Sequence, residues 1–351
     1  MELKKLIIAI CSLMSVSGHE TRSFDALKAL VGDSFDEIST DKVGNILLVR
    51  RCDKPSAAKI LVDTHFDEIG MLVTGIHKGG FLSITSVGGL DPSILQAADV
   101  IIYGKENIRG VIASTPPHLR KKDDGDKLCP ISELIIDTGY DEEELKEIVS
   151  IGTPVGFAPR YTELMGNNLS GKSFDNKACA AAAIYALSLI DKKDLAADVY
   201  LLLSCHEETH RIGGVSAGAF AISPDYAMVI DVNLARVPET PKSETVEYGN
   251  GVSVSISAIT DKALTRAVER LCTDENIKFT RVAAPSSTGT NAPSLNLTGR
   301  GVPVTDIGLP LKNMHTYNET LNLDDVYELS SLVRTFVCSD KLREEFVDEK
   351  I

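Results

Sequence analysis

Residues 199–208, with the sequence Val-Tyr-Leu-Leu-Leu-Ser-Cys-His-Glu-Glu, contain the pattern that decides the fold. The run Val199–Leu203 is apolar at every position, which is typical of a strand buried on both faces of a sheet. Two similar runs, Lys59–Asp63 and Tyr226–Ile230, also lead into polar residues. Strands of this kind occur in parallel sheets covered by helices, so the sequence predicts an α/β protein with helices on both faces of the sheet.

The segments between these strands have helical or further strand patterns. Helices are expected at 175–190, which is rich in alanine, at 213–222, at 261–274 and at 323–337. Additional strands are expected at 44–49, 252–257 and 301–307. The N-terminal run from Leu3 to about Met14 follows two lysines, as in a signal peptide, but Glu2 and the missing A-x-A site favour an amphipathic helix.

Residues 69–164 have a different character from the rest of the chain. They contain short strand-like runs, many glycines and one clear helical stretch, Asp141–Val149. We therefore expect two domains: an α/β domain formed by residues 1–68 and 165–351, and a small β-rich domain at 69–164 inserted into it.

Composition excludes several classes of protein. The chain has 351 residues, a formal net charge of −14 and no tryptophan. Such acidity argues against nonspecific binding to nucleic acid or to anionic membranes. The seven cysteines contain no C-x-x-C pair, which favours a reducing compartment, and no run reaches the roughly 18 apolar residues of a membrane span. We expect a cytoplasmic protein without nucleic-acid or membrane partners.

Histidines and carboxylates follow the predicted strands or begin a predicted helix. The candidates are His65, Asp67, Asp175, Glu207, Glu208, Asp231 and His315. Ligands of open α/β sheets bind beyond the carboxyl ends of the strands, so these residues can converge although they are distant in sequence. A set of imidazoles and carboxylates without thiolate suits two ions of zinc, cobalt or manganese bridged by one carboxylate.

The adjacent pair Glu207-Glu208 supplies two different functions. One carboxylate can bind metal while the other stays free to take a proton from water, and Asp67 can orient the imidazole of His65. Each residue alone also has an ordinary interpretation, since an Asp that begins a helix is usually an N-cap. The hypothesis depends on all of these positions falling at the edge of one sheet.

Two other motifs match patterns that the surrounding sequence does not support. His206–His210 matches H-E-x-x-H, but that zinc motif needs a helix, and here a strand precedes it and Gly213-Gly214 follows closely. Residues 166–173 match the Walker A pattern, but no buried strand precedes them, and Asp175 would repel phosphate. A polar loop that re-enters the main domain is the favoured interpretation of 166–173.

The motifs together resemble those of the TET-type metallo-aminopeptidases, which include glutamyl and deblocking aminopeptidases and members named endoglucanases. The resemblance covers nearly the whole chain. It is carried by Ser17-Gly-His-Glu20, Asp41-Lys-Val-Gly-Asn45, His65-Phe-Asp-Glu-Ile-Gly70, Asp175-Asn-Lys177, Glu207-Glu208, Asp231-Val232 and Met314-His-Thr316, in that order.

The resemblance implies a zinc-peptidase-like mixed sheet flanked by helices, with an inserted β-barrel-like domain. It places His65, Asp175 and Asp231 on one metal, and Asp175, Glu208 and His315 on the other. It also implies that Glu207 is the general base, that Asp67 orients His65, and that the chain forms a homo-oligomer, of which a dodecamer is one form. Lys177, His206 and Asn291 depart from the usual Arg, Gln and Asp, and the second Asp usual after Asp231 is not evident.

From these observations we predict a cytoplasmic aminopeptidase that uses two divalent ions, zinc first among them, to hydrolyse the N-terminal residue of short peptides. A glycosidase is one alternative, although it would need two carboxyl groups flanking a sugar bond, and the chain has few aromatic residues. A second alternative is a binding or assembly protein of the same fold that has lost catalysis.

Overall fold

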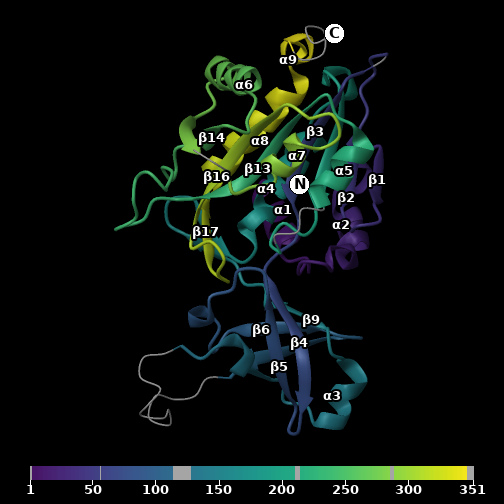
Figure 1. The fold of residues 1–351 in the computed structure, drawn as a ribbon, viewed down its shortest axis with the longest axis vertical. Helices are drawn as coiled ribbons and strands as arrows, with labels where there is room; N and C mark the ends of the chain where they lie inside the picture. The colour runs from purple at the N-terminus through teal and green to yellow at the C-terminus, as the bar shows by residue number, and fades with distance from the viewer. Residues whose placement is uncertain (1, 56, 114–127, 210–213, 285–287, 346–351) are drawn as a thin grey trace.

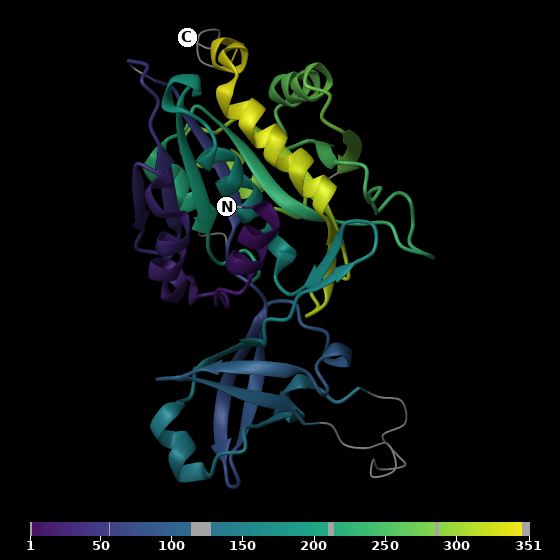
Figure 2. The same ribbon diagram turned by 180° about the vertical axis from the view of Figure 1, so that it is seen from behind.

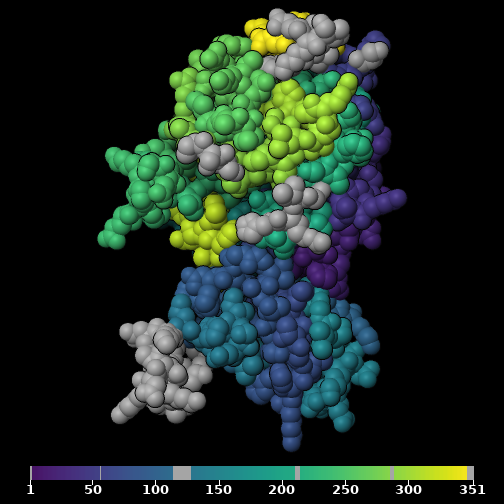
Figure 3. Space-filling view, in the orientation of Figure 1, coloured from purple at the N-terminus to yellow at the C-terminus, as the bar shows by residue number. Residues whose placement is uncertain are grey.

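The computed structural model describes residues 2–55, 57–113, 128–209, 214–284 and 288–345. These residues form a large α/β domain and a smaller barrel, which appear as two lobes in Figure 1 and in the space-filling view of Figure 3. None of the described helices has the length and hydropathy needed to cross a lipid bilayer.

The α/β domain is built on one mixed sheet, in the order β1-β2-β12-β3-β13-β16-β17-β11-β10, with β14 and β15 attached beside β16. Its strands in the described residues are β1 (Glu37–Thr40), β2 (Ile46–Arg50), β3 (Lys59–His65), β10 (Thr162–Leu164), β11 (Asn168–Gly171), β12 (Asp198–Ser204), β13 (Tyr226–Leu234), β14 (Val252–Ser257), β15 (Phe279–Ala284), β16 (Val304–Lys312) and β17 (Glu319–Asn322). The central strands β12, β3, β13 and β16 are parallel and almost completely buried, as their continuous apolar runs predict.

Helices cover both faces of this sheet, as the sequence predicted. The described α-helices are α1 (Leu3–Cys11), α2 (Phe24–Val31), α3 (Glu142–Ile148), α4 (Phe174–Ser188), α5 (Gly214–Ile222), α6 (Lys262–Asp274), α7 (Ala292–Asn296), α8 (Leu323–Cys338) and α9 (Asp340–Arg343). Of these, α3 belongs to the barrel domain and does not cover this sheet. Figure 2 shows α1, α4 and α8 on one face, where α4 packs against both of the others. Helices α5 and α7 pack on the opposite face. The alanine-rich α4 is buried on nearly every side, because it lies between the sheet and α8.

The second domain is a closed barrel with the strand order β4-β5-β8-β7-β6-β9. Its strands are β4 (Gly70–His77), β5 (Phe81–Val87), β6 (Asp99–Tyr103), β7 (Asn107–Ile112), β8 (Ile135–Asp137) and β9 (Pro154–Phe157). Alternate residues of these strands point inward to a separate apolar core, which is the pattern of a small barrel.

Several element boundaries differ from the sequence expectations. Strand β13 continues to Leu234, so Asp231 lies inside the strand instead of after it. Helix α1 ends at Cys11 and not near Met14, although its apolar face packs into the main core as expected. Strand β10 pairs with β11 of the main sheet, so the barrel strands span 70–157 within the segment expected at 69–164. Residues 162–171 form a hairpin here, where a polar loop was expected.

Candidate metal centre

The parallel strands bring the predicted metal ligands to one edge of the sheet. His65 ends β3 and is paired in register with Ser204 of β12, which is three residues before Glu207. Asp231 extends from β13, the other neighbour of β3. Asp175 lies at the start of α4, where the backbone is not yet helical and the Asp175–Asn176 peptide is cis. These elements converge at the carboxyl ends of the strands, where open α/β sheets bind ligands.

The first group contains His65, Asp175 and Asp231, and all three side chains are buried. His65 Nε2 lies 3.0 Å from Asp175 Oδ1 and 3.6 Å from Asp231 Oδ1. The other ring nitrogen, Nδ1, is 3.0 Å from the main-chain oxygen of Asp67. A hydrogen bond from Nδ1–H to that carbonyl leaves Nε2 as the nitrogen that faces the two carboxylates.

The second group contains Asp175, Glu208 and His315. His315 Nε2 lies 3.3 Å from Asp175 Oδ2 and 3.4 Å from Glu208 Oε2. Asp175 therefore presents one carboxylate oxygen to each histidine. This is the arrangement that a bridging ligand between two neighbouring cations requires.

Asp67 holds the glutamate pair through the backbone. Its carboxylate oxygens accept hydrogen bonds from the main-chain N–H groups of Glu207 and Glu208, at 3.1 and 3.0 Å. The same carboxylate is 3.6 Å from Nδ1 of His65, so the shorter contact with that histidine is made by the main-chain oxygen of Asp67. Glu207 is only partly buried and lines a cavity of about 200 Å³ together with the five ligand candidates.

The electrostatics of the two groups fit positively charged ligands. Burial raises the pKa of Asp231 to about 7, with the charge of Glu207 adding to this effect. Burial and the charge of Asp175 raise the pKa of Glu208 well above its usual value. Burial alone would lower the pKa of His65, but the charge of Asp231 and contacts with Asp175 raise it well above 6.5. Crowded carboxylates in a buried site are costly without a cation, and histidine with carboxylate is a donor set that Zn²⁺, Co²⁺ and Mn²⁺ accept.

Two side chains support these ligands in ways that the sequence did not predict, although Asn176 stands in one of the quoted motifs. Glu319 is buried on β17 and accepts hydrogen bonds from the main-chain N–H groups of Phe174, Asp175 and His315, at 2.6, 3.1 and 3.1 Å. Asn176 donates to the main-chain oxygen of Ile230, which precedes Asp231. Glu319 thus connects the main chains of Asp175 and His315, two ligand candidates of the second group that are distant in sequence. Its position in the Asn318-Glu-Thr sequence gave no signal of this function.

The residues that depart from the resembled pattern replace none of the ligand candidates. Lys177 is completely buried and its Nζ lies 3.2 Å from Glu68 Oε2, while Asn291 donates to Asp63 and Ser204. His206 contacts the main-chain oxygen of Val43.

The two discounted motifs also have structural explanations. Residues 207–209 form a turn instead of a helix, and His210 lies outside the described residues. Lys172 of the Walker-like sequence has its amine buried against Glu68 at 2.6 Å, so that it is not available to a phosphate.

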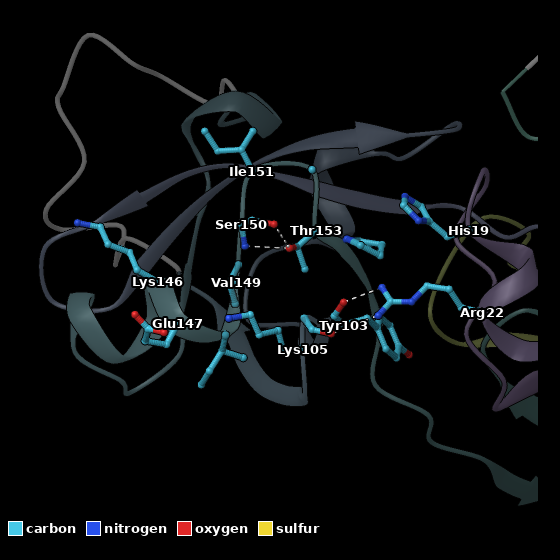
Figure 4. A pocket seen from close by; sticks show the side chains of 14 residues that line it. His19, Arg22, Tyr103, Lys105, Lys146, Glu147, Val149, Ser150, Ile151 and Thr153 are labelled. Atoms are coloured by element: carbon cyan, nitrogen blue, oxygen red, sulfur yellow. Dashed lines mark hydrogen bonds between the residues drawn. The ribbon is translucent and has the colours of Figure 1, made fainter.

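A larger hollow of about 400 Å³ lies between the N-terminal segment and the barrel, and Figure 4 shows its lining. In that view Arg22 reaches across to the barrel, where it donates to the main-chain oxygens of Tyr103 and Gly104 at 2.7 and 3.2 Å. The hollow shares no lining residue with the candidate metal centre. Arg22 therefore links the N-terminal segment to the barrel.

The fold is an α/β domain with an inserted barrel, and its candidate site carries the histidine and carboxylate donors that metal-dependent hydrolases use. The sequence pattern of the M42 glutamyl aminopeptidase family matches residues 44–332, and the chain belongs to that family. It is accordingly an aminopeptidase, a peptide hydrolase, and the family is metal-dependent.

Two of the similar proteins carry aminopeptidase or peptidase names, and a third is named endoglucanase. A lysyl aminopeptidase of Pyrococcus furiosus is 29% identical over 96% of each chain. The TET1 peptidase of Pyrococcus horikoshii, which can assemble into a tetrahedron or a large octahedral shell, superposes with a TM-score of 0.84 at 26% identity, over 96% of this chain and 99% of that one. A Thermotoga maritima protein named endoglucanase superposes with a TM-score of 0.75 at 27% identity, over 96% of each chain.

Proposed function

We propose that this aminopeptidase hydrolyses the N-terminal residue of short peptides with a pair of divalent metal ions and Glu207 as general base. The observation that carries the proposal is Asp175, whose two oxygens face His65 and His315 separately. His65, Asp175 and Asp231 would hold one ion, and Asp175, Glu208 and His315 the other. Zinc suits this donor set best, with cobalt or manganese as alternatives.

When bound, the ions polarise the scissile carbonyl and make a water molecule acidic enough to be deprotonated near neutral pH. Glu207 then takes that proton and later delivers it to the leaving amine. Asp67 fixes the backbone of Glu207 and Glu208 at the cavity that both residues line, so that Glu208 would hold metal while Glu207 would take the proton. Glu319 holds Asp175 and His315 in the orientation that both ions need.

The cavity is small, which favours the end of a chain over an internal bond. Its volume of about 200 Å³ accommodates roughly one residue, and the carboxylate of Glu207 can also attract a free α-amino group. The lining includes Val232 and Met314, which are apolar.

The Glu207→Gln variant tests the assignment of the base. It should keep both metal ions and its fold but lose more than about 100-fold in kcat on aminoacyl anilides, the magnitude usual for a lost general base. A Glu239→Gln variant, changed at an exposed position, is the matched control. Unchanged turnover in Glu207→Gln with full metal content would refute the assignment.

We also propose that the chain forms a homo-oligomer, as the TET1 relative does. Phe220 and Leu297, on α5 and directly after α7, are 73% and 79% exposed and line a shared apolar hollow. Exposed apolar pairs of this kind are typical of interfaces. Sedimentation velocity should give a mass of several chains that a Phe220→Lys variant reduces, and a monomeric wild-type protein would exclude this proposal.

A further inference from the structure

A third group of potential ligands lies beside the candidate metal centre and shares none of its residues. It comprises Glu20, at the start of a short 3₁₀ helix (Glu20–Ser23), and Cys205 and His206, which directly follow β12. One ligand atom from each side chain lies within 4.8 Å of the other two. Glu20 and Cys205 are each 2% exposed, and the His206 side chain is 17% exposed. We call these three residues the Glu20 cluster.

The imidazole of His206 is oriented as metal-binding histidines usually are. Its Nε2 lies 3.1 Å from the main-chain oxygen of Val43, so Nε2 carries the proton and donates it to that carbonyl. The other ring nitrogen, Nδ1, faces Glu20 Oε1 at 4.0 Å, which is too long for a hydrogen bond, and in the neutral imidazole its lone pair is available to a metal ion. Ligand atoms around one tetrahedral zinc lie about 3.5 Å apart, so a small contraction would place an ion between them.

Two glycines leave space around the cluster. A Cβ atom added to Gly44 would lie 3.7 Å from Cys205 Sγ and 3.9 Å from Glu20 Oε2. A Cβ atom on Gly18 would lie 3.8 Å from Cε1 of His206. Both glycines have positive φ values, +112° and +89°, which side chains of other residues rarely permit. The backbone therefore approaches the cluster from two sides without a side chain filling it.

The charge of Glu20 is not balanced by a lysine or arginine of the described residues, and the one basic group that faces it is the imidazole of His206. Its Oε1 accepts hydrogen bonds from the main-chain N–H groups of Gly18 and His206, at 3.0 and 3.3 Å. Among the described residues, no Lys or Arg nitrogen lies within 4.0 Å of this carboxylate, and burial together with the charge of Asp67 raises its pKa. A cation at this position would supply the missing positive charge.

We propose that Glu20, Cys205 and His206 form a third metal site, for a single zinc ion or a cation of similar softness. Thiolate, imidazole and carboxylate are the donors that Zn²⁺ combines with, and three protein ligands leave a fourth position for water. Binding releases the thiol proton of Cys205 to solvent, and no other bond changes. The ion ties the segment that carries Glu207 to the helix at Glu20–Ser23, so it stabilises the position of the base without taking part in hydrolysis.

Cobalt substitution separates this site from the catalytic pair, because only the Glu20 cluster contains sulfur. Chelator-treated full-length protein is titrated with Co²⁺ while bound metal and the near-ultraviolet spectrum are measured. We expect three ions per chain and a sulfur-to-cobalt charge-transfer band, which carboxylate and imidazole ligands cannot produce. The Cys205→Ser variant should bind two ions and lack the band, and a Cys52→Ser variant should behave as wild type.

The His206→Gln variant provides a second test that retains the thiol. Loss of one of three ligands should weaken cobalt binding at this site at least 100-fold, beyond the 10–100-fold typical of losing an outer partner. Two ions and no charge-transfer band in the wild type, or a band that persists in Cys205→Ser, would overturn the proposal. Because these readouts do not use hydrolysis, they are independent of the proposed mechanism.

Discussion

The Glu68→Gln substitution should strongly destabilise the protein, because Glu68 is the carboxylate between two buried lysines. Its Oε2 accepts hydrogen bonds from Lys172 at 2.6 Å and from Ser173, and it lies 3.2 Å from Lys177 Nζ. Its Oε1 accepts the main-chain N–H of Ser15 at 3.0 Å. The group joins the segment after β3 to the residues that precede Asp175, so it also supports the candidate metal centre.

The magnitude follows from the pKa of Glu68. Burial alone would raise this pKa, but the charges of Lys172 and Lys177 lower it from 4.5 to about 2. This lowering of the pKa corresponds to about 3 kcal/mol of stability, which is present above pH 4.5 and is lost as the pH falls towards 2. Burial lowers the pKa of Lys177 to about 8, so this lysine is costly when charged and would lose its main compensation. We therefore expect Glu68→Gln to cost about 3–5 kcal/mol at pH 7.

Equilibrium urea unfolding of the wild type and Glu68→Gln between pH 7 and pH 2.5 measures the difference in their free energies of unfolding. This difference should shrink steadily below pH 4.5, because the protonated wild-type carboxyl then resembles the amide. Glu163→Gln, which removes an exposed ion pair with Lys4, is the matched control and should have little effect. A difference below about 1 kcal/mol at pH 7, or one that does not vary with pH, would refute the reasoning.

Two further predictions concern other buried carboxylates. The Glu319 carboxylate accepts three main-chain N–H groups, and in Glu319→Gln the amide must turn its NH₂ group towards some of them. Metal affinity, measured by chelator competition, should therefore fall about 10–100-fold. Unchanged affinity would show that Glu319 does not position Asp175 and His315. Burial raises the pKa of Asp306 to about 7, although hydrogen bonds from Thr288 and Thr290 act to lower it. The ionised carboxylate of Asp306 therefore destabilises the folded state as the pH rises from 4 through 7. Asp306→Asn should therefore match the wild type in stability at acidic pH and exceed it by several kcal/mol at pH 9, and a constant difference across that range would contradict this account.

The sequence was sufficient where a local pattern determines the structure. The continuous apolar runs at 59–63 and 199–203 became central parallel strands, and the alanine-rich segment after Asp175 became the buried helix α4. The helix expected at 261–274 begins after Asp261, whose side chain accepts the main-chain N–H groups of Ala263 and Leu264. Each of these signals lies within the segment that it describes.

Features that depend on residues distant in the chain could not be predicted from the local sequence. Strand β15 (Phe279–Ala284) lies at the edge of the sheet, and its mixed exposure gives no continuous apolar run. Glu319 acts on Phe174, 145 residues away, and nothing in its local sequence marks it as an acceptor. The extension of β13 past Asp231 depends on its pairing with β16, which begins more than 70 residues later. Closure of the barrel likewise depends on the pairing of β6 with β9.

Anomalous diffraction from crystals of zinc-loaded protein, recorded on both sides of the zinc absorption edge, tests the central claim most directly. The account predicts two neighbouring zinc peaks that share Asp175, one coordinated by His65 and Asp231 and the other by Glu208 and His315. Two metal ions held this way lie roughly 3.5–4 Å apart. A single peak at this edge of the sheet, or zinc bound there without Asp175 between the ions, would contradict it.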